Sequence, residues 1–197
     1  PTGTLVAEAE LARLADALAA LALLVLDSAY AEYVRAPGHS GGIDLVRARD
    51  NVVMTRTFSK IHGLAALRLG WAYAPEHVID VLNRVRGPFN VTAPALAAGR
   101  AAIRDRAWVE HCIVTNEVWR DWLAKEIRAA GFVVTDSHAN FLLVETGEAT
   151  AAVDAHLKAH GLIARRMDSY ALPGHLRISV GDEGACRAVA DAVADFA

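Results

Sequence analysis

The most reactive candidate in the sequence is Lys60, which lies in the segment "TRTFSKIHGLAALRLGW" (55–71). Two hydroxyl residues, Thr57 and Ser59, precede it, and Arg68 follows eight residues later. A lysine is a nucleophile only in its neutral form, which a desolvated site or a neighbouring cation such as Arg68 favours. The segment therefore predicts a Schiff-base lysine, beside hydroxyls and a guanidinium fork that suit a phosphate group.

A carboxylate and a phenol complete this set. Asp27 ends the apolar run "LALLVLD" (21–27), and Tyr30 follows it. Ligands of open parallel sheets gather at the carboxyl ends of strands, and the chain between Asp27 and Lys60 is long enough for a crossover connection. A pyridine cofactor acts as an electron sink only while its ring nitrogen is protonated, and an ion-paired carboxylate maintains that state. We expect Asp27 in this role and Tyr30 as a donor to the cofactor's phenolic oxygen.

Each of these residues also has an ordinary interpretation. Lys60 would then be a solvated surface charge, Arg68 would pair with a surface carboxylate, and Asp27 would cap a turn. Tyr30 would be a packing residue, and Thr57 would be an ordinary strand residue that binds no ligand. The combination of acid, amine and guanidinium near predicted strand ends favours the cofactor site over these alternatives.

Composition excludes several classes of protein. A chain of 197 residues that is 54% hydrophobic can bury a core in one or two domains. A net charge of −3 gives no general attraction to nucleic acid or to an anionic membrane. No apolar run reaches the roughly 20 residues that span a bilayer, and the start of the chain lacks a signal-peptide pattern. Two cysteines are too few for a disulfide framework, so we expect a reducing, cytoplasmic setting.

Hydrophobic patterning predicts an α/β chain in which strands alternate with helices. Strands are expected over 21–27, 51–58, 69–75, 132–135, 140–145, 162–167 and 175–181, and helices over 5–20, 75–87, 93–105, 106–130, 148–160 and 183–196. The first strand reads as a parallel strand that is covered on both faces. Trp108, Trp119 and Trp122 fall at helical spacing and are expected in the core.

The histidines and cysteines do not predict a metal site. His111, His156 and His160 lack supporting acidic partners at metal-ligand spacing, so none is expected. Cys112 and Cys186 lie in helical apolar patterns, where a buried thiol behaves as a small hydrophobic group.

The sequence resembles the fold-type I, pyridoxal-phosphate-dependent aminotransferases of class I/II, and most closely their histidinol-phosphate branch. The segments that carry the resemblance are "DSAY" (27–30), "TRTFSK" (55–60), "RLGW" (68–71), "ANF" (139–141) and "LPGHLRISVG" (172–181). The resemblance implies an α/β fold with a mostly parallel sheet. Residues 1–104 would form the later part of the cofactor-binding large domain, and 105–197 a connecting long helix and a small C-terminal domain.

The resemblance also implies roles for individual residues. It implies that Asp27 binds the cofactor's pyridine nitrogen, Tyr30 its O3′, Lys60 its aldehyde carbon as a Schiff base, and Ser59 and Arg68 its phosphate. The residue pattern itself adds Thr57 as a further hydroxyl for the phosphate. Arg177 would bind an anionic group of the amino donor together with Arg165. The alternatives are a charge at a strand edge for Arg177 and a solvated charge for Arg165. Two positions depart from the family pattern, Ser28 where glutamate is common and His62 where an aromatic residue is common.

The implied activity is transamination of L-histidinol phosphate with 2-oxoglutarate in histidine biosynthesis, by a cytoplasmic homodimer that uses pyridoxal 5′-phosphate. Three alternatives remain: an aromatic amino acid aminotransferase, a lyase resembling threonine-phosphate decarboxylase, and an inactive fragment. The chain opens on the turn residues "PTGT" (1–4), and in the family this turn follows an asparagine that binds O3′. We therefore expect an upstream segment, and cofactor binding only when that segment is supplied.

Overall fold

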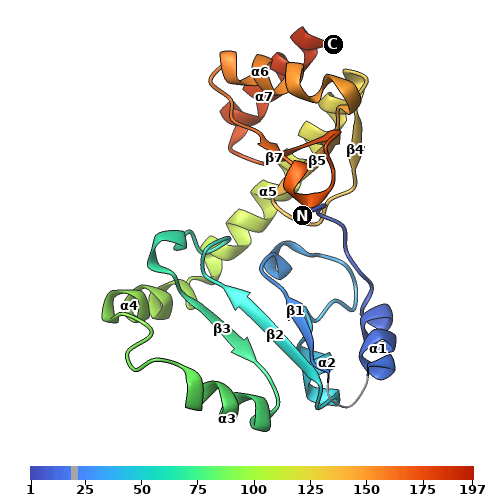
Figure 1. Ribbon diagram of the computed structural model, residues 1–197. Helices are drawn as coiled ribbons and strands as arrows, with labels where there is room; N and C mark the ends of the chain where they lie inside the picture. The colour runs from blue at the N-terminus through green and yellow to red at the C-terminus, as the bar shows by residue number, and fades with distance from the viewer. Residues whose placement is uncertain (19–21) are drawn as a thin grey trace. The chain divides into compact units, whose positions relative to one another are not determined.

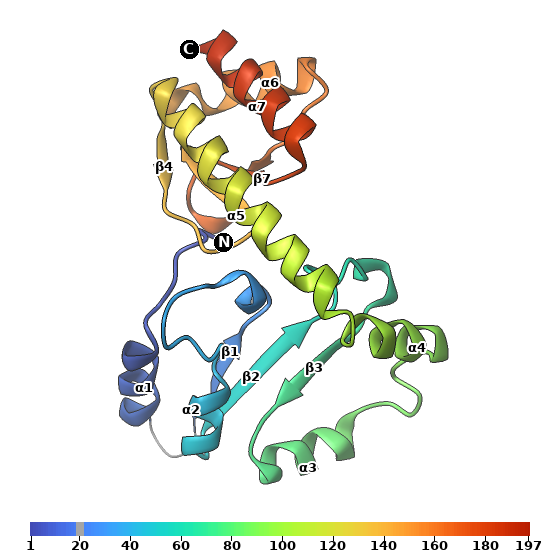
Figure 2. The same ribbon diagram turned by 180° about the vertical axis from the view of Figure 1, so that it is seen from behind.

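The computed structural model describes residues 1–18 and 22–197 (Figures 1 and 2). Contacts divide these residues into two units. We call Val6–His111 the Lys60 unit, and Pro1–Leu5 together with Cys112–Ala197 the Arg177 unit. Each unit combines a β-sheet with helices, which confirms the predicted α/β class.

The Lys60 unit contains a three-stranded sheet in the order β1-β2-β3. Its strands are β1 (Leu24–Asp27), β2 (Val52–Thr57) and β3 (Gly70–Tyr73). β1 runs parallel to β2, whereas β3 runs antiparallel to β2, so this sheet is mixed. The central strand is the most deeply buried, because Val52 and Met54 have no exposed surface.

Only one face of β1 is covered. Leu26 is 9% exposed, but its neighbour Val25 is 57% exposed. Leu26 packs with Ala15 of α1 and Leu45 of α2 in one core cluster. The prediction that both faces of this strand are covered was therefore wrong, because the packed helices contact only the face that carries Leu26.

Among the described residues, four α-helices begin and end within the Lys60 unit. They are α1 (Glu8–Ala17), α2 (Ile43–Ala48), α3 (Glu76–Val85) and α4 (Ala93–Ala102). Three correspond to predicted helices. Residues 19–20 of the first predicted helix and residue 21 of the first predicted strand lie outside the described residues. The sequence did not predict α2, because six residues are too few for a 3.6-residue period to emerge.

The Arg177 unit contains a four-stranded antiparallel sheet in the order β4-β5-β7-β6. Its strands are β4 (Val133–Thr135), β5 (Phe141–Glu145), β6 (Arg165–Arg166) and β7 (His175–Ser179). Its helices are α6 (Thr150–Ala159), α7 (Glu183–Phe196) and the later part of α5 (Arg106–Ala129), inside which the unit boundary falls. The strand predicted over 162–167 shortens to two residues, because only Arg165 and Arg166 pair with β7.

The core of the Arg177 unit lies between its sheet and its helices. Leu123 and Ile127 of α5 and Leu176 of β7 have no exposed surface. Trp119 and Trp122 pack against this core. Their two rings contact each other edge to face, with centroids 5.4 Å apart. Burial raises the pKa of the Cys186 thiol, which lies in the same core, so this cysteine is protected from modification.

Trp108 does not follow the prediction made for the three tryptophans. It is 49% exposed, so its placement in the core was wrong. It belongs to the first turn of α5, and its indole N–H donates to the backbone oxygen of Ile61 at 3.0 Å. Helical spacing aligned it with Trp119 and Trp122, but the first turns of α5 belong to a different unit from the core of those residues.

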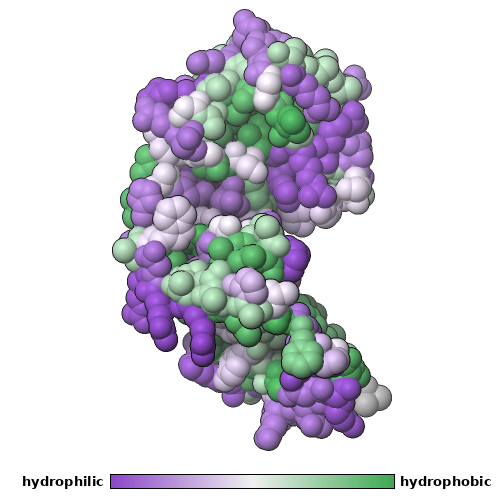
Figure 3. Space-filling view, turned by 90° about the vertical axis from the view of Figure 1, so that its left-hand side faces the viewer, coloured by the Kyte–Doolittle hydropathy of each residue, from purple (hydrophilic) through white to green (hydrophobic). Residues whose placement is uncertain are grey.

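Exposed apolar residues gather on the Lys60 unit. Figure 3 shows one face of the molecule on which hydrophobic groups lie among hydrophilic ones. Large apolar side chains of α3 and the loop after it are exposed, namely Val81, Leu82, Val85 and Phe89. Clusters of this kind are typical of surfaces that another polypeptide covers. No described helix is long and apolar enough to cross a membrane.

Gly70 is required where β3 approaches β2. A Cβ atom built on Gly70 would lie 2.8 Å from the backbone oxygen of Arg56, which a side-chain rotation cannot relieve. We expect Gly70→Ala to lower the free energy of unfolding by about 1–3 kcal/mol, measured by urea denaturation. Gly87→Ala is the matched control, because a Cβ there meets nothing within 4 Å. Equal stability of the two variants would contradict this reason for the glycine.

Candidate functional site

The predicted cofactor residues of the Lys60 unit gather at one edge of its sheet. Asp27 is the last residue of β1, and the parallel register pairs it with Thr55 of β2. The ladder continues one step further, because the backbone N–H of Ser28 donates to the oxygen of Thr55 at 3.0 Å. The carboxyl ends of β1 and β2 therefore lie side by side, and Thr57 ends β2 at the same edge.

The loop that carries Lys60 is anchored at both ends. The backbone N–H of Phe58 donates to the oxygen of Leu69 at 3.0 Å, and the oxygen of Phe58 accepts from Leu64 at 2.9 Å. Phe58, Ile61 and Leu69 are buried. These apolar anchors fix the loop, while Lys60 remains exposed between Phe58 and Ile61.

Thr57 and Ser59 shape the start of this loop. The hydroxyl of Thr57 accepts a hydrogen bond from the backbone N–H of Ser59 at 3.0 Å. This is a local turn of the kind that threonine side chains favour. The Thr57 hydroxyl therefore has a structural role, and its own hydrogen is still available for donation to a ligand.

Lys60 and Tyr30 meet across the sheet edge. The ammonium nitrogen of Lys60 lies 5.1 Å from the centroid of the Tyr30 ring, which is within the range of a cation–π interaction. Among the described residues no carboxylate forms an ion pair with Lys60, whereas Lys158 lies 2.7 Å from Asp154. The Lys60 amine is therefore positioned by an aromatic face and is not engaged by an acid.

Arg68 adopts an unusual backbone conformation at the end of the same loop. Its φ and ψ of 53° and 44° are left-handed, which costs a non-glycine residue roughly 1–2 kcal/mol. Its guanidinium is exposed and, among the described residues, donates one hydrogen bond, to the backbone oxygen of Ala65 at 2.7 Å. The remaining donors of the fork are available for an anion.

Two contacts that support this edge were missed by sequence reasoning. Trp108 donates its indole N–H to the backbone oxygen of Ile61, next to Lys60. Arg56 and Glu32 form a mostly buried ion pair at 2.8 Å, which joins β2 to the short 3₁₀ helix that follows Tyr30. No local pattern indicates either contact, because the partners lie far apart in the sequence.

His62 occupies the position where the family resemblance implies an aromatic residue. Its ring packs against Phe58, with centroids 4.9 Å apart and an interplanar angle of 34°. An imidazole therefore supplies the ring contact with Phe58 at this position. Its Nδ1 atom is buried and has no hydrogen-bond partner among the described residues.

Arg177 and Arg165 lie in the other unit, so they are described separately from the Lys60 group. They are directly paired on β7 and β6. The Arg177 guanidinium carbon lies 4.7 Å from the ring centroid of Phe141, and that of Arg165 lies 5.3 Å from the ring centroid of Tyr170. Two like charges placed directly opposite each other destabilise an antiparallel pair unless an anion compensates them.

The neighbouring Arg166 differs from Arg165. It donates two hydrogen bonds to Asp168, both 2.9 Å long, and this guanidinium holds the pKa of the Asp168 carboxyl below its usual range. Within the described part of the chain, neither Arg165 nor Arg177 forms an ion pair. Arg165 and Arg177, unlike Arg166, therefore each carry a charge that is available to bind a ligand.

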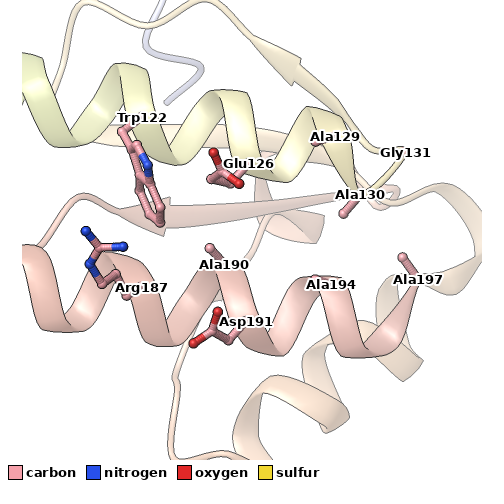
Figure 4. Close-up of a pocket in the computed structure, with 10 residues that line it drawn as sticks. All are labelled: Trp122, Glu126, Ala129, Ala130, Gly131, Arg187, Ala190, Asp191, Ala194 and Ala197. Atoms are coloured by element: carbon pink, nitrogen blue, oxygen red, sulfur yellow. The ribbon is translucent and has the colours of Figure 1, made fainter.

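A groove of about 630 Å³ lies between α5 and α7 (Figure 4). Trp122 lines it from α5 and Arg187 from α7, and the Arg187 guanidinium packs 5.2 Å from a Trp122 ring centroid. The rest of its lining is mainly alanine, with Glu126 and Asp191. None of the predicted site residues lines this groove.

The prediction that His156 and His160 lack an acidic partner was wrong. The carboxylate of Asp195 lies 3.6 Å from His156 Nε2, because α7 packs beside α6 and brings a residue distant in the sequence to this histidine pair. Ligand atoms of the three residues lie within 4.8 Å of one another.

A family model for aminotransferases of class I and II matches residues 1–193. The chain belongs to this family. It is 57% identical over 198 residues to the histidinol-phosphate aminotransferase of Dinoroseobacter shibae, and 55% identical over 199 residues to that of Ruegeria pomeroyi. Each match includes 100% of this chain and 54% of the relative. This member of the aminotransferase family thus spans about half the length of the curated relatives it matches.

Solved structures place the aminotransferase chain in the same fold. Histidinol-phosphate aminotransferase from Sinorhizobium meliloti, solved with pyridoxal-5′-phosphate, matches with a TM-score of 0.90 at 27% identity, over 99% of this chain and 54% of the other. An aspartate aminotransferase variant from Thermus thermophilus matches with a TM-score of 0.86 at 22% identity, over 100% of this chain and 57% of the other, and shows the fold alone. These matches confirm the predicted fold-type I architecture.

Proposed function

We propose that this chain forms part of a pyridoxal-phosphate-dependent aminotransferase that converts L-histidinol phosphate and 2-oxoglutarate to imidazole-acetol phosphate and glutamate. The observation that carries the proposal is the convergence of Lys60, Tyr30 and Asp27 at one sheet edge. The 57% identity to a relative named for this activity supports the choice of substrate.

The donor set at this edge fits the proposed cofactor. Lys60 would hold it covalently, and Asp27 would accept a hydrogen bond from its pyridine nitrogen. Tyr30 would donate to its phenolic oxygen. Ser59 and Arg68, with Thr57 as a further hydroxyl, would bind its phosphate. When bound, pyridoxal phosphate supplies an electron sink for the carbon that loses a proton.

The chain's own groups then perform defined tasks. The Lys60 amine would hold the cofactor in the absence of substrate and, once free, would move a proton as general base and acid. The adjacent ring of Tyr30 would restrict the positions that the Lys60 amine can occupy. The Asp27 carboxylate would keep the pyridine nitrogen protonated.

Arg177 and Arg165 are proposed to bind the anionic groups of the substrates. One substrate carries a phosphate and the other two carboxylates, so a site used by both must recognise anions. Support comes from the paired positions of the two arginines and from their lack of ion pairs within the described residues. A bound anion would offset the repulsion between them.

Replacement of Arg177 tests this substrate role. We expect Arg177→Lys to raise the KM for histidinol phosphate about 10- to 100-fold with a smaller change in kcat, because lysine keeps the charge but loses the bidentate fork. Steady-state kinetics measure both constants, and Arg166→Lys is the control, since Arg166 is bonded to Asp168. An unchanged KM in Arg177→Lys would remove Arg177 from the substrate site.

We further propose that residues 1–104 belong to the cofactor domain and that residues 105–197 form the connecting helix and small domain, a division that differs from the contact units in Pro1–Leu5 and in residues 105–111. We also propose a cytoplasmic homodimer. The exposed apolar side chains of α3 support a covered surface in the assembled enzyme, and dimerisation would provide the cover.

A graft supplies the decisive experiment. The chain replaces the matching 54% of the Dinoroseobacter shibae enzyme, and the purified chimera is assayed with histidinol phosphate and 2-oxoglutarate. Glutamate formation that requires pyridoxal phosphate supports the proposal. A folded, cofactor-loaded chimera that acts only on aromatic amino acids, or that releases carbon dioxide without forming glutamate, would replace it with one of the alternative activities.

The isolated chain provides the companion measurement. We expect the 197 residues alone to show no visible absorption band of lysine-bound cofactor, and the chimera to show one. A chimera that folds, as judged by circular dichroism, but binds no cofactor would refute the proposed function.

A further inference from the structure

Two histidines and an aspartate gather where α6 and α7 end. His156 lies in the last turn of α6, and His160 caps the C-terminus of that helix. Asp195 lies in the last turn of α7, which packs beside α6 (Figures 1 and 2). One potential ligand atom from each residue lies within 4.8 Å of the other two. We propose that these three residues form a zinc site that joins α6 to α7.

The hydrogen bond of His160 orients it for metal binding. Its Nδ1 atom lies 3.0 Å from the backbone oxygen of His156. With the proton on Nδ1, this nitrogen donates to the carbonyl and leaves the lone pair of Nε2 free for a metal. A backbone carbonyl that fixes the tautomer in this way is a usual partner of zinc-binding histidines.

His156 and Asp195 have nearly the separation that zinc requires. His156 Nε2 lies 3.6 Å from the Asp195 carboxylate, and two ligands of a tetrahedral zinc ion with bonds of about 2.1 Å are about 3.4 Å apart. The same nitrogen lies 3.0 Å from the backbone oxygen of Ala192, a contact that a metal bond would replace. The Phe196 ring packs against His156 and holds it half-buried.

Electrostatics favours a cation at this position. Both helices present their C-terminal ends to the cluster, and each end carries a partial negative charge. The last turn of α7 contains Asp195 and no basic residue. Lys158, in the last turn of α6, is occupied by its ion pair with Asp154 at 2.7 Å. A divalent cation would offset this excess of negative charge.

The ligand chemistry favours zinc over magnesium and calcium. Two imidazole nitrogens and one carboxylate oxygen suit Zn²⁺, whereas Mg²⁺ and Ca²⁺ prefer oxygen ligands alone. His160 and Asp195 are exposed, so changes of side-chain rotamer can draw their ligand atoms inward. Three protein ligands leave a fourth position for water.

Zinc titration of the 197-residue chain tests the proposal. The chain is purified without a polyhistidine tag, freed of metal with a chelator and titrated with zinc chloride in a calorimeter. We expect one zinc ion per chain with micromolar affinity. We also expect a rise of a few degrees in Tm at saturating zinc, since a ligand of the native state stabilises it.

Single substitutions locate the site. His160→Ala and Asp195→Asn are each expected to weaken zinc binding at least about tenfold and to remove most of the rise in Tm. His77→Ala, which changes an exposed histidine on α3, is the matched control and should bind zinc like the unaltered chain. Circular dichroism without zinc verifies that each variant is folded.

Two outcomes would overturn the zinc site. One is the absence of saturable zinc uptake by the folded chain in the micromolar range. The other is uptake that His160→Ala and Asp195→Asn leave unchanged. Neither result bears on the proposed aminotransferase activity, because the cluster contains no residue of the Lys60 edge, and failure of the grafted enzyme would leave the zinc result standing.

Discussion

Lys60→Ala is expected to reduce transamination by the chimera at least about 10⁴-fold. The variant removes both the amine that would hold the cofactor and the group that would move the proton, and residues that act as nucleophile or general base contribute effects of this size. The visible absorption band of lysine-bound cofactor should disappear as well. Initial rates of glutamate formation and an absorption spectrum measure the two effects.

A second variant distinguishes the effect of the charge of Lys60 from that of its covalent chemistry. Lys60→Arg keeps a cation beside Tyr30 but offers no amine that forms a Schiff base, so we expect it to be as inactive as Lys60→Ala. Lys125→Ala is the control, because Lys125 is exposed on α5 and is one of only three lysines in the chain. Substantial activity in Lys60→Arg would show that the position supplies charge alone, and the Schiff-base assignment would be abandoned.

Asp27→Asn is expected to lower kcat by about 10²- to 10³-fold. The amide has nearly the shape of the carboxylate but no charge, so it cannot keep the pyridine nitrogen protonated, and losses of this size follow the removal of one charge-stabilising group. The structural cost should be small, because Asp27 is exposed at the end of β1. Steady-state kinetics of the chimera measure the effect.

A matched acid distinguishes this role from a general effect of charge. Asp50 is an exposed aspartate just before β2, at the opposite end of the parallel strand pair. We expect Asp50→Asn to retain the kcat of the unaltered chimera. If the two variants lost activity equally while remaining folded, the specific role of Asp27 would be untenable.

Local sequence was sufficient for most elements and for some of their ends. Pro75 predicts the end of a strand, and β3 ends at Tyr73. Gly131 predicts a left-handed residue after the long helix, and it has a φ of 91° two residues beyond the end of α5. These signals work because proline and glycine restrict or widen the backbone angles of their own residue, independently of the rest of the fold.

Burial was harder to predict than element type. The apolar run of β1 indicated cover on both faces, yet Val25 is 57% exposed. The spacing of Trp108 indicated a core residue, yet it is half-exposed and bonded to the Lys60 loop. Periodicity reports which residues share a face of one element, but the elements that cover that face are set by packing between distant segments.

The sequence by itself determined the residue types of the proposed cofactor site and the positions of Asp27, Thr57 and Lys60 at or just beyond strand ends. Only the tertiary structure decided which side chains meet. It placed the Lys60 amine over Tyr30 and brought Asp195 to the histidines of α6. The physical reason is that strand register and helix packing fix distances between residues far apart in the chain, and no local spacing records those distances.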